Sequence, residues 1–294
     1  MRLWIILCCL SIACPMVGHA EPIQIYIQKL PSGVINWTTY TLTSTPEISV
    51  QATADSSQNS ENTTQRQQPT RRQATENLMK TIEQVRINTD CYVADALNQA
   101  PQIKANVLQM CQNAKTVTQT HLDGNPAPES VQMGLLGGFM QLMLPEEIRQ
   151  VEPIKAMSEN TAKPLLLPPG DDAERKKADN DGIYSGLIID ARGIGAKPAM
   201  VPAIVDETGK QVYGSIFISR EYAVQFGVCI YVRGIENPPG YARIAPHPLT
   251  VKGLRTVDGR DCDIVISNAD AAKLRDASAN LGFLKQCRVI IVLD

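Results

Sequence analysis

The feature that most constrains the fold is the apolar run CRVIIVL at Cys287–Leu293. A strand with one face in water alternates apolar and polar residues, whereas a run that is apolar throughout is typical of a strand buried on both faces. Such a strand needs covering layers on both sides of its sheet. The run therefore predicts the central strand of an α/β domain over residues 183–294.

Further elements of that domain are indicated by short apolar segments between turn residues. Each expected strand is rich in Val and Ile and is bounded by Gly, Pro, Asn or Asp. The strands are expected at Tyr184–Asp190, Met200–Val205, Val228–Arg233, Val251–Leu254 and Asp263–Ser267. Helices are expected at Arg220–Phe226 and Ala269–Ala279.

The preceding region, residues 21–145, predicts an α+β domain. Residues 23–50 show the alternation and the β-branched content of strands. Residues 52–72 contain no Val, Ile, Leu or aromatic residue, so they cannot bury a core and are expected to form a disordered loop. Strand character returns at residues 113–121 and 130–144.

Two helices are expected within this first domain. One should begin near Thr70, where Gln73 completes a capping-box pattern. Its buried face, read from three- and four-residue spacing, would be Ala74, Leu78, Ile82 and Val85. The other should begin at Pro101, because proline suits the first helical position.

The composition changes at residues 146–182, where several prolines are followed by a densely charged run. Such a composition predicts a linker. The fold class expected for the whole chain is α+β. It would consist of two small α/β-type domains, each a mixed sheet packed by a few helices, after a cleaved signal peptide.

Residues 1–20 have the layout of a secretory signal peptide. Arg2 precedes the apolar run Leu3–Ala13, and small residues stand one and three places before a cut at Glu21. The chain is therefore expected to be exported to the periplasm or the periplasmic face of the outer membrane. The alternative is a lipid anchor at Cys14, but Pro15 follows it and the preferred leucine of that motif is missing. No later segment is long and apolar enough to predict a membrane helix.

Charge and cysteine content limit the classes of partner and cofactor that are expected. The net charge is −2 and no basic stripe is visible, so nucleic acid is not an expected partner. The cysteines after residue 20 form no CxxC pair, and no cofactor or metal site is expected. Cys91 and Cys111 fall in one helical region and are the candidate disulfide.

Catalytic motifs are sparse. After residue 20 the chain has only His121 and His247, each in a segment that reads as a loop, and it has no GxSxG elbow. No catalytic residue is assigned.

The most informative polar segment is the loop Asp190–Lys197. A strand that ends in a carboxylate, followed by Gly193 and Gly195 and by the cations Arg192 and Lys197, could cradle an anion through backbone N–H groups. The alternative is a tight turn fixed by an Asp190–Arg192 pair. The segment lacks the third glycine of a dinucleotide fingerprint, which favours the structural interpretation.

The chain also resembles known bacterial proteins. The segments YSGLIIDARGIGAKPAMVPAIVDETGKQVYG, DIVISNADAAKL and FLKQCRVIIVLD resemble a domain of uncharacterised exported bacterial proteins. In the first half, GVINW, RRQATENLMKTIEQVRI and LLGGFMQLMLP are similar in layout to the LPP-twenty lipoprotein group, which includes FlgP- and FlgT-like flagellar accessory proteins. The resemblance implies an envelope setting and supplies no catalytic residues.

Two function hypotheses follow. The first is a non-catalytic exported envelope protein with a structural or assembly role, accessory to a flagellum or a secretion apparatus. It would contact envelope or flagellar proteins, or itself, through strand edges and the apolar segment 133–144. The second is a periplasmic ligand-binding or hydrolytic domain that uses the Asp190–Lys197 loop.

Overall fold

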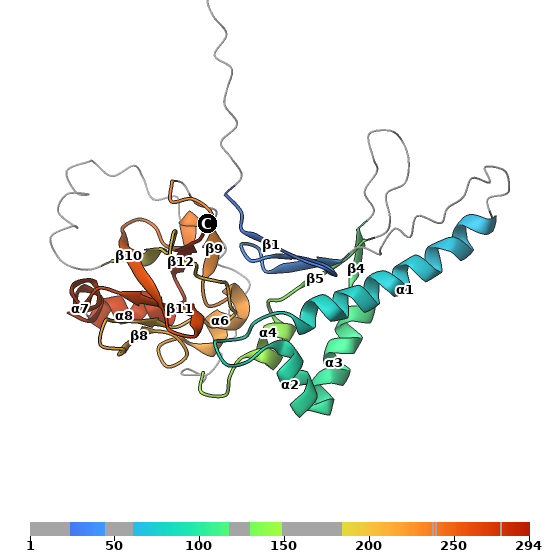
Figure 1. Cartoon of the computed structure of the whole chain (residues 1–294), viewed down its shortest axis with the longest axis horizontal. Coiled ribbons are helices and arrows are strands. Elements are labelled where there is room, and N and C mark those ends of the chain that lie inside the picture. The colour runs from blue at the N-terminus through green and yellow to red at the C-terminus, as the bar shows by residue number, and fades with distance from the viewer. Residues whose placement is uncertain are drawn as a thin grey trace, which may run out of the picture.

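The computed structural model describes residues 24–44, 61–117, 130–148, 184–236, 238, 240–276 and 278–294. Within them the chain forms a five-stranded and a seven-stranded sheet with helices, so the predicted α+β class is confirmed (Figure 1). We refer to residues 24–148 as the first half and to residues 184–294 as the second half. The signal peptide with Cys14, residues 52–60 of the expected loop, His121, and the linker from residue 149 lie outside the described residues.

The five-stranded sheet belongs to the first half and has the order β1-β2-β3-β5-β4. Its strands are β1 (Ile27–Leu30), β2 (Gly33–Asn36), β3 (Thr41–Ser44), β4 (Lys115–Val117) and β5 (Ser130–Gly134). Every pairing in it is antiparallel, which corrects the expected mixed sheet. The physical reason is that β1–β2 and β2–β3 are joined by short turns, and such turns can connect only antiparallel neighbours.

Helix α1 (Glu61–Glu83) packs against this sheet. Its predicted inward face is confirmed, because Ala74, Leu78, Ile82 and Val85 are fully buried, the last just beyond the helix end. Its predicted start near Thr70 is wrong, since the helix already begins at Glu61. The expected disordered loop therefore does not extend to residue 72. Gln, Glu and Arg, which recur in the first part of α1, are good helix formers and allow the helix to begin before the apolar pattern that predicts it.

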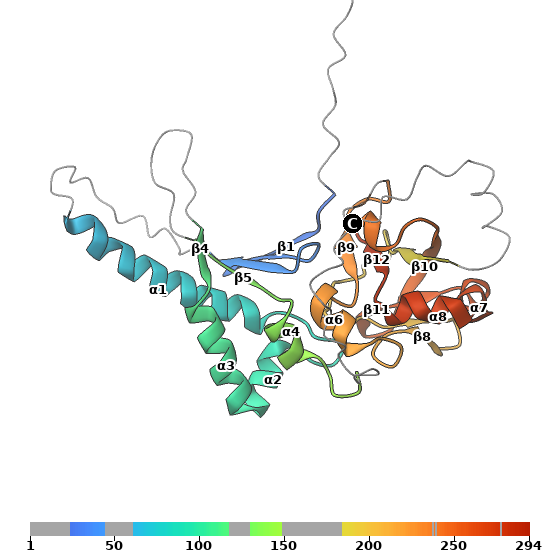
Figure 2. The ribbon, with the colours of Figure 1, turned by 180° about the vertical axis from the view of Figure 1, so that it is seen from behind.

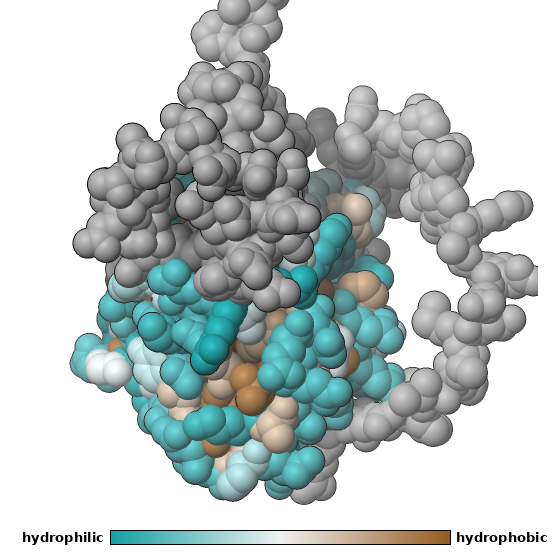
Figure 3. All heavy atoms as spheres, turned by 90° about the vertical axis from the view of Figure 1, so that its right-hand side faces the viewer, coloured by the Kyte–Doolittle hydropathy of each residue, from teal (hydrophilic) through white to brown (hydrophobic). Residues whose placement is uncertain are grey.

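Three further helices complete the first half: α2 (Val93–Gln99), α3 (Pro101–Gln112) and α4 (Gly138–Met143). Helix α3 begins at Pro101 as predicted, whereas α2 is not predicted from the sequence. Helix α4 replaces the end of a strand expected over residues 130–144. The apolar side chains of segment 133–144 are largely in the core, so that segment is not the exposed contact surface that was expected. Figure 3 shows a mostly hydrophilic surface on this side of the molecule, with a small apolar group.

The seven-stranded sheet belongs to the second half and has the order β8-β7-β11-β10-β6-β12-β9. Its strands are β6 (Gly186–Asp190), β7 (Ile204–Val205), β8 (Gln211–Tyr213), β9 (Ile230–Val232), β10 (Pro248–Val257), β11 (Arg260–Ile266) and β12 (Val289–Val292). Strand β12 lies between β6 and β9 and is parallel to both. Its side chains alternate between two hydrophobic clusters, Val289 and Ile291 in one and Ile290 and Val292 in the other. The strand buried on both faces that CRVIIVL predicts is confirmed, although it lies next to the edge strand β9 and not at the centre of the sheet.

The remaining helices of the second half are α6 (Arg220–Phe226), α7 (Asn268–Asp276), α8 (Ser278–Lys285) and the 3-10 turn η1 (Tyr241–Arg243). The single helix expected at Ala269–Ala279 is thus two successive helices. No helix among the described residues could span a lipid bilayer.

The two halves share one hydrophobic cluster, which includes Trp37 and Leu78 from the first half and Tyr231 and Ile291 from the second. Figure 2 shows the five-stranded sheet with α1 to α3 on one side of the molecule and the seven-stranded sheet with α7 and α8 on the other. The chain just before β1 reaches both sheets: the Arg233 N–H donates to the Gln24 carbonyl over 3.0 Å, and Ile25 forms a bridge with Val232 at the edge of β9. One short segment therefore connects the two sheets directly.

Candidate functional site

The Asp190–Lys197 loop is closed by its own charges. The guanidinium of Arg192 donates from Nε and Nη2 to the Asp190 carboxylate, over 2.8 and 3.0 Å, and Lys252 Nζ lies 3.5 Å from it. Hydrogen bonding from Arg192 outweighs the opposing effect of burial and lowers the pKa of Asp190 to about 2. The Asp190–Arg192 pair of the structural interpretation is present.

The other end of the loop is also occupied by groups of this chain. The Gly193 N–H donates to both carboxylate oxygens of Asp294, at 2.9 and 3.1 Å, so the anion that this N–H meets is a side chain of the protein itself. Lys197 Nζ lies 2.9 Å from the Asp261 carboxylate. Gly193 and Gly195 have φ of +78° and +69°, a backbone conformation that favours glycine. Asp190 ends β6 and the other four candidate residues follow it in the loop, where Asp190, Arg192, Gly193 and Lys197 bond to groups of this chain.

The candidate disulfide is not present. Cys91 and Cys111 are both free thiols. Cys91 lies in the loop before α2, whereas Cys111 is buried in α3 with its Sγ 3.9 Å from Met79 Sδ of α1. The two thiols have different partners, because Cys91 Sγ donates to the Tyr92 carbonyl over 3.3 Å whereas Cys111 Sγ faces Met79. His247 lies before β10, where its N–H donates to Ser185 Oγ over 2.8 Å.

A second arrangement, which sequence reasoning missed, lies at the junction of the halves. Arg220, the first residue of α6, donates to four carbonyls of the first half. Nη1 reaches the carbonyls of Pro145 and Ile148 at 3.0 and 3.2 Å, and Nη2 reaches those of Gln141 and Leu144 at 2.7 and 3.3 Å. Arg220 thereby satisfies carbonyls that the end of α4 leaves without a helical partner.

A charged bridge joins the halves at another point. Arg86, which follows α1, donates to the Asp261 carboxylate of β11. The same carboxylate forms the ion pair with Lys197. Burial alone would raise the pKa of Asp261, but hydrogen bonds from Lys197 and Arg86 outweigh it and hold the pKa below its ordinary value. The Met200 and Val201 N–H groups donate to carbonyls of residues 86 and 87 nearby. Asp261 thus takes part in the junction through Arg86 of the first half.

Buried hydroxyls complete the junction. Tyr40 Oη donates to the Cys229 carbonyl over 2.6 Å, and Thr38 Oγ1 donates to the Tyr231 carbonyl over 2.5 Å. The Tyr40 ring lies against Gly227, where an added Cβ would come within 2.5 Å of a ring carbon. Because Gly227 also has a φ of +75°, only glycine fits there without strain.

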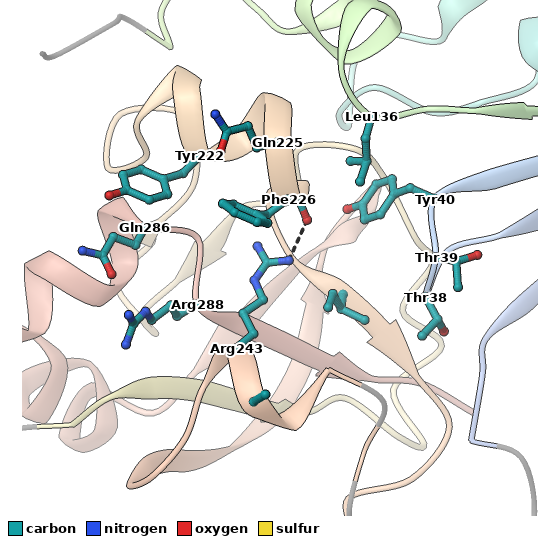
Figure 4. A pocket seen from close by; sticks show the side chains of 12 residues that line it. Thr38, Thr39, Tyr40, Leu136, Tyr222, Gln225, Phe226, Arg243, Gln286 and Arg288 are labelled. Atoms are coloured by element: carbon teal, nitrogen blue, oxygen red, sulfur yellow. Dashed lines mark hydrogen bonds between the residues drawn. The ribbon is translucent and has the colours of Figure 1, made fainter. Parts of the chain in front are cut away.

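A cavity of about 490 Å³ opens at this junction. Its walls come from the β2–β3 turn (Thr38, Thr39 and Tyr40), from α6 (Tyr222, Gln225 and Phe226), from η1 (Arg243), and from the α8–β12 connection (Gln286 and Arg288) (Figure 4). In the figure Arg243 lies beside Phe226, to whose carbonyl it donates. Sequence reasoning could not find this cavity, because its lining residues come from segments far apart in the chain.

Backbone strain gathers around the cavity. In the described part of the chain the non-glycine residues with a positive φ are Tyr40 (54°) and Cys287 (57°). Tyr40 lines the cavity, and Cys287 stands between the lining residues Gln286 and Arg288. Such a conformation costs about 1–3 kcal/mol per residue and persists only where the surroundings enforce it. Burial raises the pKa of the Cys287 thiol to about 11, so this thiol is protonated at neutral pH.

The fold and the junction together define a two-sheet α+β protein whose halves are held together by buried polar contacts. Its second half, residues 186–294, matches a domain family described as Treponema pallidum Tp0624, second domain. The match extends over the whole seven-stranded sheet, from β6 to β12. It supports the expected likeness of the second half to a bacterial domain, and it lends no support to the LPP-twenty likeness expected of the first half. No curated protein matches the chain.

Proposed function

We propose that this protein is a non-catalytic, exported component of a bacterial cell envelope with a structural or assembly role. The observation that carries the proposal is the construction of the junction. Arg220, Arg86, Asp261 and Tyr40, whose side chains could otherwise serve a binding or reacting site, hold the two sheets in one arrangement. An arrangement fixed in this way suits a protein that presents surfaces at a constant spacing.

Strand edges offer a contact surface for such a role. In the described part of the chain, β1 and β4 are the outer strands of the five-stranded sheet, and β8 ends the seven-stranded sheet. An outer strand presents unpaired backbone donors and acceptors, to which a strand of another chain can add. Because segment 133–144 is in the core, we assign envelope contacts or self-association to these edges instead.

The export part of the proposal rests on the pattern of residues 1–20, and the flagellar setting rests on the LPP-twenty resemblance of the first half. N-terminal sequencing of the protein from its own host tests the former. A mature chain that begins at Glu21 supports signal-peptide cleavage, whereas labelling by palmitate that is lost in Cys14→Ser supports the lipid anchor instead. An unprocessed chain that begins at Met1 contradicts export by either route.

The ligand-binding alternative on the Asp190–Lys197 loop has lost its main support. The donors and cations that would hold an anion there are engaged by Asp190, Asp261 and Asp294.

The assembly role is tested by crosslinking in the host, with the tagged full chain expressed at its native level. We expect capture of envelope components or of a second copy of the chain. The matched control is Leu7→Arg, which places a charge in the apolar run of the signal and blocks export. Crosslinks should disappear in this variant although the mature sequence is unchanged. Recovery of a monomer without partners from envelope fractions would overturn the assembly role.

A further inference from the structure

The cavity at the junction of the two halves carries positive charge. Its lining residues include Arg243 and Arg288 and no Asp or Glu. Arg243 donates to the carbonyls of Cys287, Phe226 and Gly227, each over 2.6 Å. Carbonyls orient a guanidinium but do not neutralise it, and three bonds leave two of its five N–H donors for another acceptor.

Arg288 adds a second cation. It is half-buried between α8 and β12, and its side chain makes no hydrogen bond or ion pair with the residues that the structure describes. Arginine is the side chain best suited to bind a carboxylate, because its planar donors match two oxygens at once. A cavity wall with two arginines and no acid therefore favours an anionic occupant.

The wall that α6 contributes is aromatic and partly open to solvent. Tyr222 and Phe226 of α6 lie nearly parallel, with ring centroids 6.4 Å apart and an interplanar angle of 27°. Phe226 is 49% exposed, a large fraction for a phenylalanine beside a cavity. Figure 4 shows both rings on the α6 side of the cavity, with Leu136 and Tyr40 across from them. An apolar body would be covered by these side chains.

We propose that this cavity binds a small carboxylate with an apolar body, such as a fatty or aromatic acid. The carboxylate would face Arg288 and the free donors of Arg243, and the apolar body would lie against Phe226 and Tyr222. The volume of about 490 Å³ falls in the range of small-molecule sites, which run from about 300 to 1,000 Å³. The two strained residues flanking the cavity, Tyr40 and Cys287, support the assignment, because enforced strain is concentrated at binding sites. The ligand would then contact both halves of the molecule at once.

The test uses the chain from Glu21 onward in titration calorimetry, with two carboxylates and their neutral amides. The probes are decanoate with decanamide and 2-naphthoate with 2-naphthamide, because each pair differs in charge and hardly in shape. We expect at least one carboxylate to bind, and its amide to bind at least about tenfold more weakly, since a charge-assisted bond to arginine is lost.

Three variants locate the binding. Arg288→Gln should weaken the carboxylate by about tenfold and leave the amide unchanged. Phe226→Ala should weaken both members of the pair. Arg255→Gln is the matched control, since Arg255 is an exposed arginine of β10 outside the cavity, and it should change neither. The proposal is overturned if neither carboxylate binds, if acid and amide bind alike, or if Arg288→Gln and Arg255→Gln have the same effect.

Discussion

Single carboxylate side chains of the second half hold loops in place through hydrogen bonds and ion pairs. Asp206 accepts from the N–H groups of Thr208 and Lys210 and from the guanidinium of Arg275, and these bonds shape the turn before β8. Hydrogen bonding from Thr208, followed by that from Arg275, lowers the pKa of Asp206 well below its ordinary value. Asp190 likewise stabilises the loop after β6 by accepting hydrogen bonds from Arg192. Each of these acids is therefore a stability determinant at neutral pH.

Asp190→Asn should lower the free energy of unfolding at pH 7 by about 1–2 kcal/mol, after allowance for the partial exposure of Arg192. The folded-state pKa of Asp190 is depressed from 3.8 to about 2. Its contribution is therefore complete above pH 4 and is lost as the pH falls from about 4 to 2. Urea denaturation at pH 7 and at pH 2 should show the difference between wild type and variant shrinking in acid. Asp258→Asn in the exposed β10–β11 turn is the control, and an equal loss in both variants would contradict a specific role for Asp190.

Gly227→Ala tests the contact between Tyr40 and the second half. The new Cβ would meet ring carbons of Tyr40 at 2.5 and 2.6 Å on a backbone of positive φ. We expect a loss of at least about 2 kcal/mol in thermal unfolding, because overpacking and a left-handed conformation both add to the cost. Gly282→Ala in α8 is the matched control: its Cβ meets nothing within 4 Å, and it should stabilise by about 0.5–1 kcal/mol. A tolerated Gly227→Ala would mean that the ring does not lie where we place it.

At the element scale, the strands and the buried helix face could be predicted from residue patterns. Strand β12 was recognisable because both its faces are apolar, and α1 because four buried residues recur at helical spacing. The start of α1 at Glu61 could not be predicted, because residues 61–70 have no apolar periodicity and include Pro69, a residue that disfavours a helix interior. The sequence predicts a strand where α4 forms, because GGFMQLM is short and apolar, and periodicity cannot distinguish a buried helix from a buried strand at that length.

The candidate sites differ in how far they could be predicted from the sequence. Asp190 and Arg192 are two positions apart, so their pairing could be proposed from the sequence. By contrast, Tyr40 meets Cys229 across 189 residues, and Arg220 meets carbonyls 72 to 79 residues away. Backbone carbonyls leave no signature in the sequence, so an arginine that binds them looks like any surface cation. The role of Arg243, which binds three carbonyls, could not be predicted for the same reason.

Thr38→Val tests the connection that the β2–β3 turn makes with the second half. Thr38 Oγ1 donates to the Tyr231 carbonyl and accepts from the Tyr26 N–H over 2.8 Å. Valine has the same shape but leaves both groups without a partner, so we expect a loss of about 1–3 kcal/mol in urea denaturation. Thr39→Val is the matched control, because Thr39 is exposed and its hydroxyl bonds to the neighbouring Thr41 hydroxyl of the first half. Equal stability of the two variants would show that the Thr38 hydrogen bonds are not needed.

At the scale of the whole molecule, the central claim is that the two sheets form one body. Three kinds of contact support it: the shared hydrophobic cluster, the strand segment at Gln24–Ile25 that reaches both sheets, and the polar contacts of Arg220, Arg86 and Tyr40. Both proposals depend on it. A structural component must keep its two surfaces in register, and the junction cavity exists only while the halves are together.

Hydrogen exchange followed by mass spectrometry in increasing urea tests this claim most directly, with the chain from Glu21 onward. Slowly exchanging amides of α1 in the first half and of β12 in the second would each report the free energy of opening of their own half. If the halves are one cooperative body, the two values and their urea dependences should coincide, and Thr38→Val should lower both equally. Opening of α1 at a lower urea concentration than β12, with β12 unaffected by Thr38→Val, would show two independent domains and contradict the account.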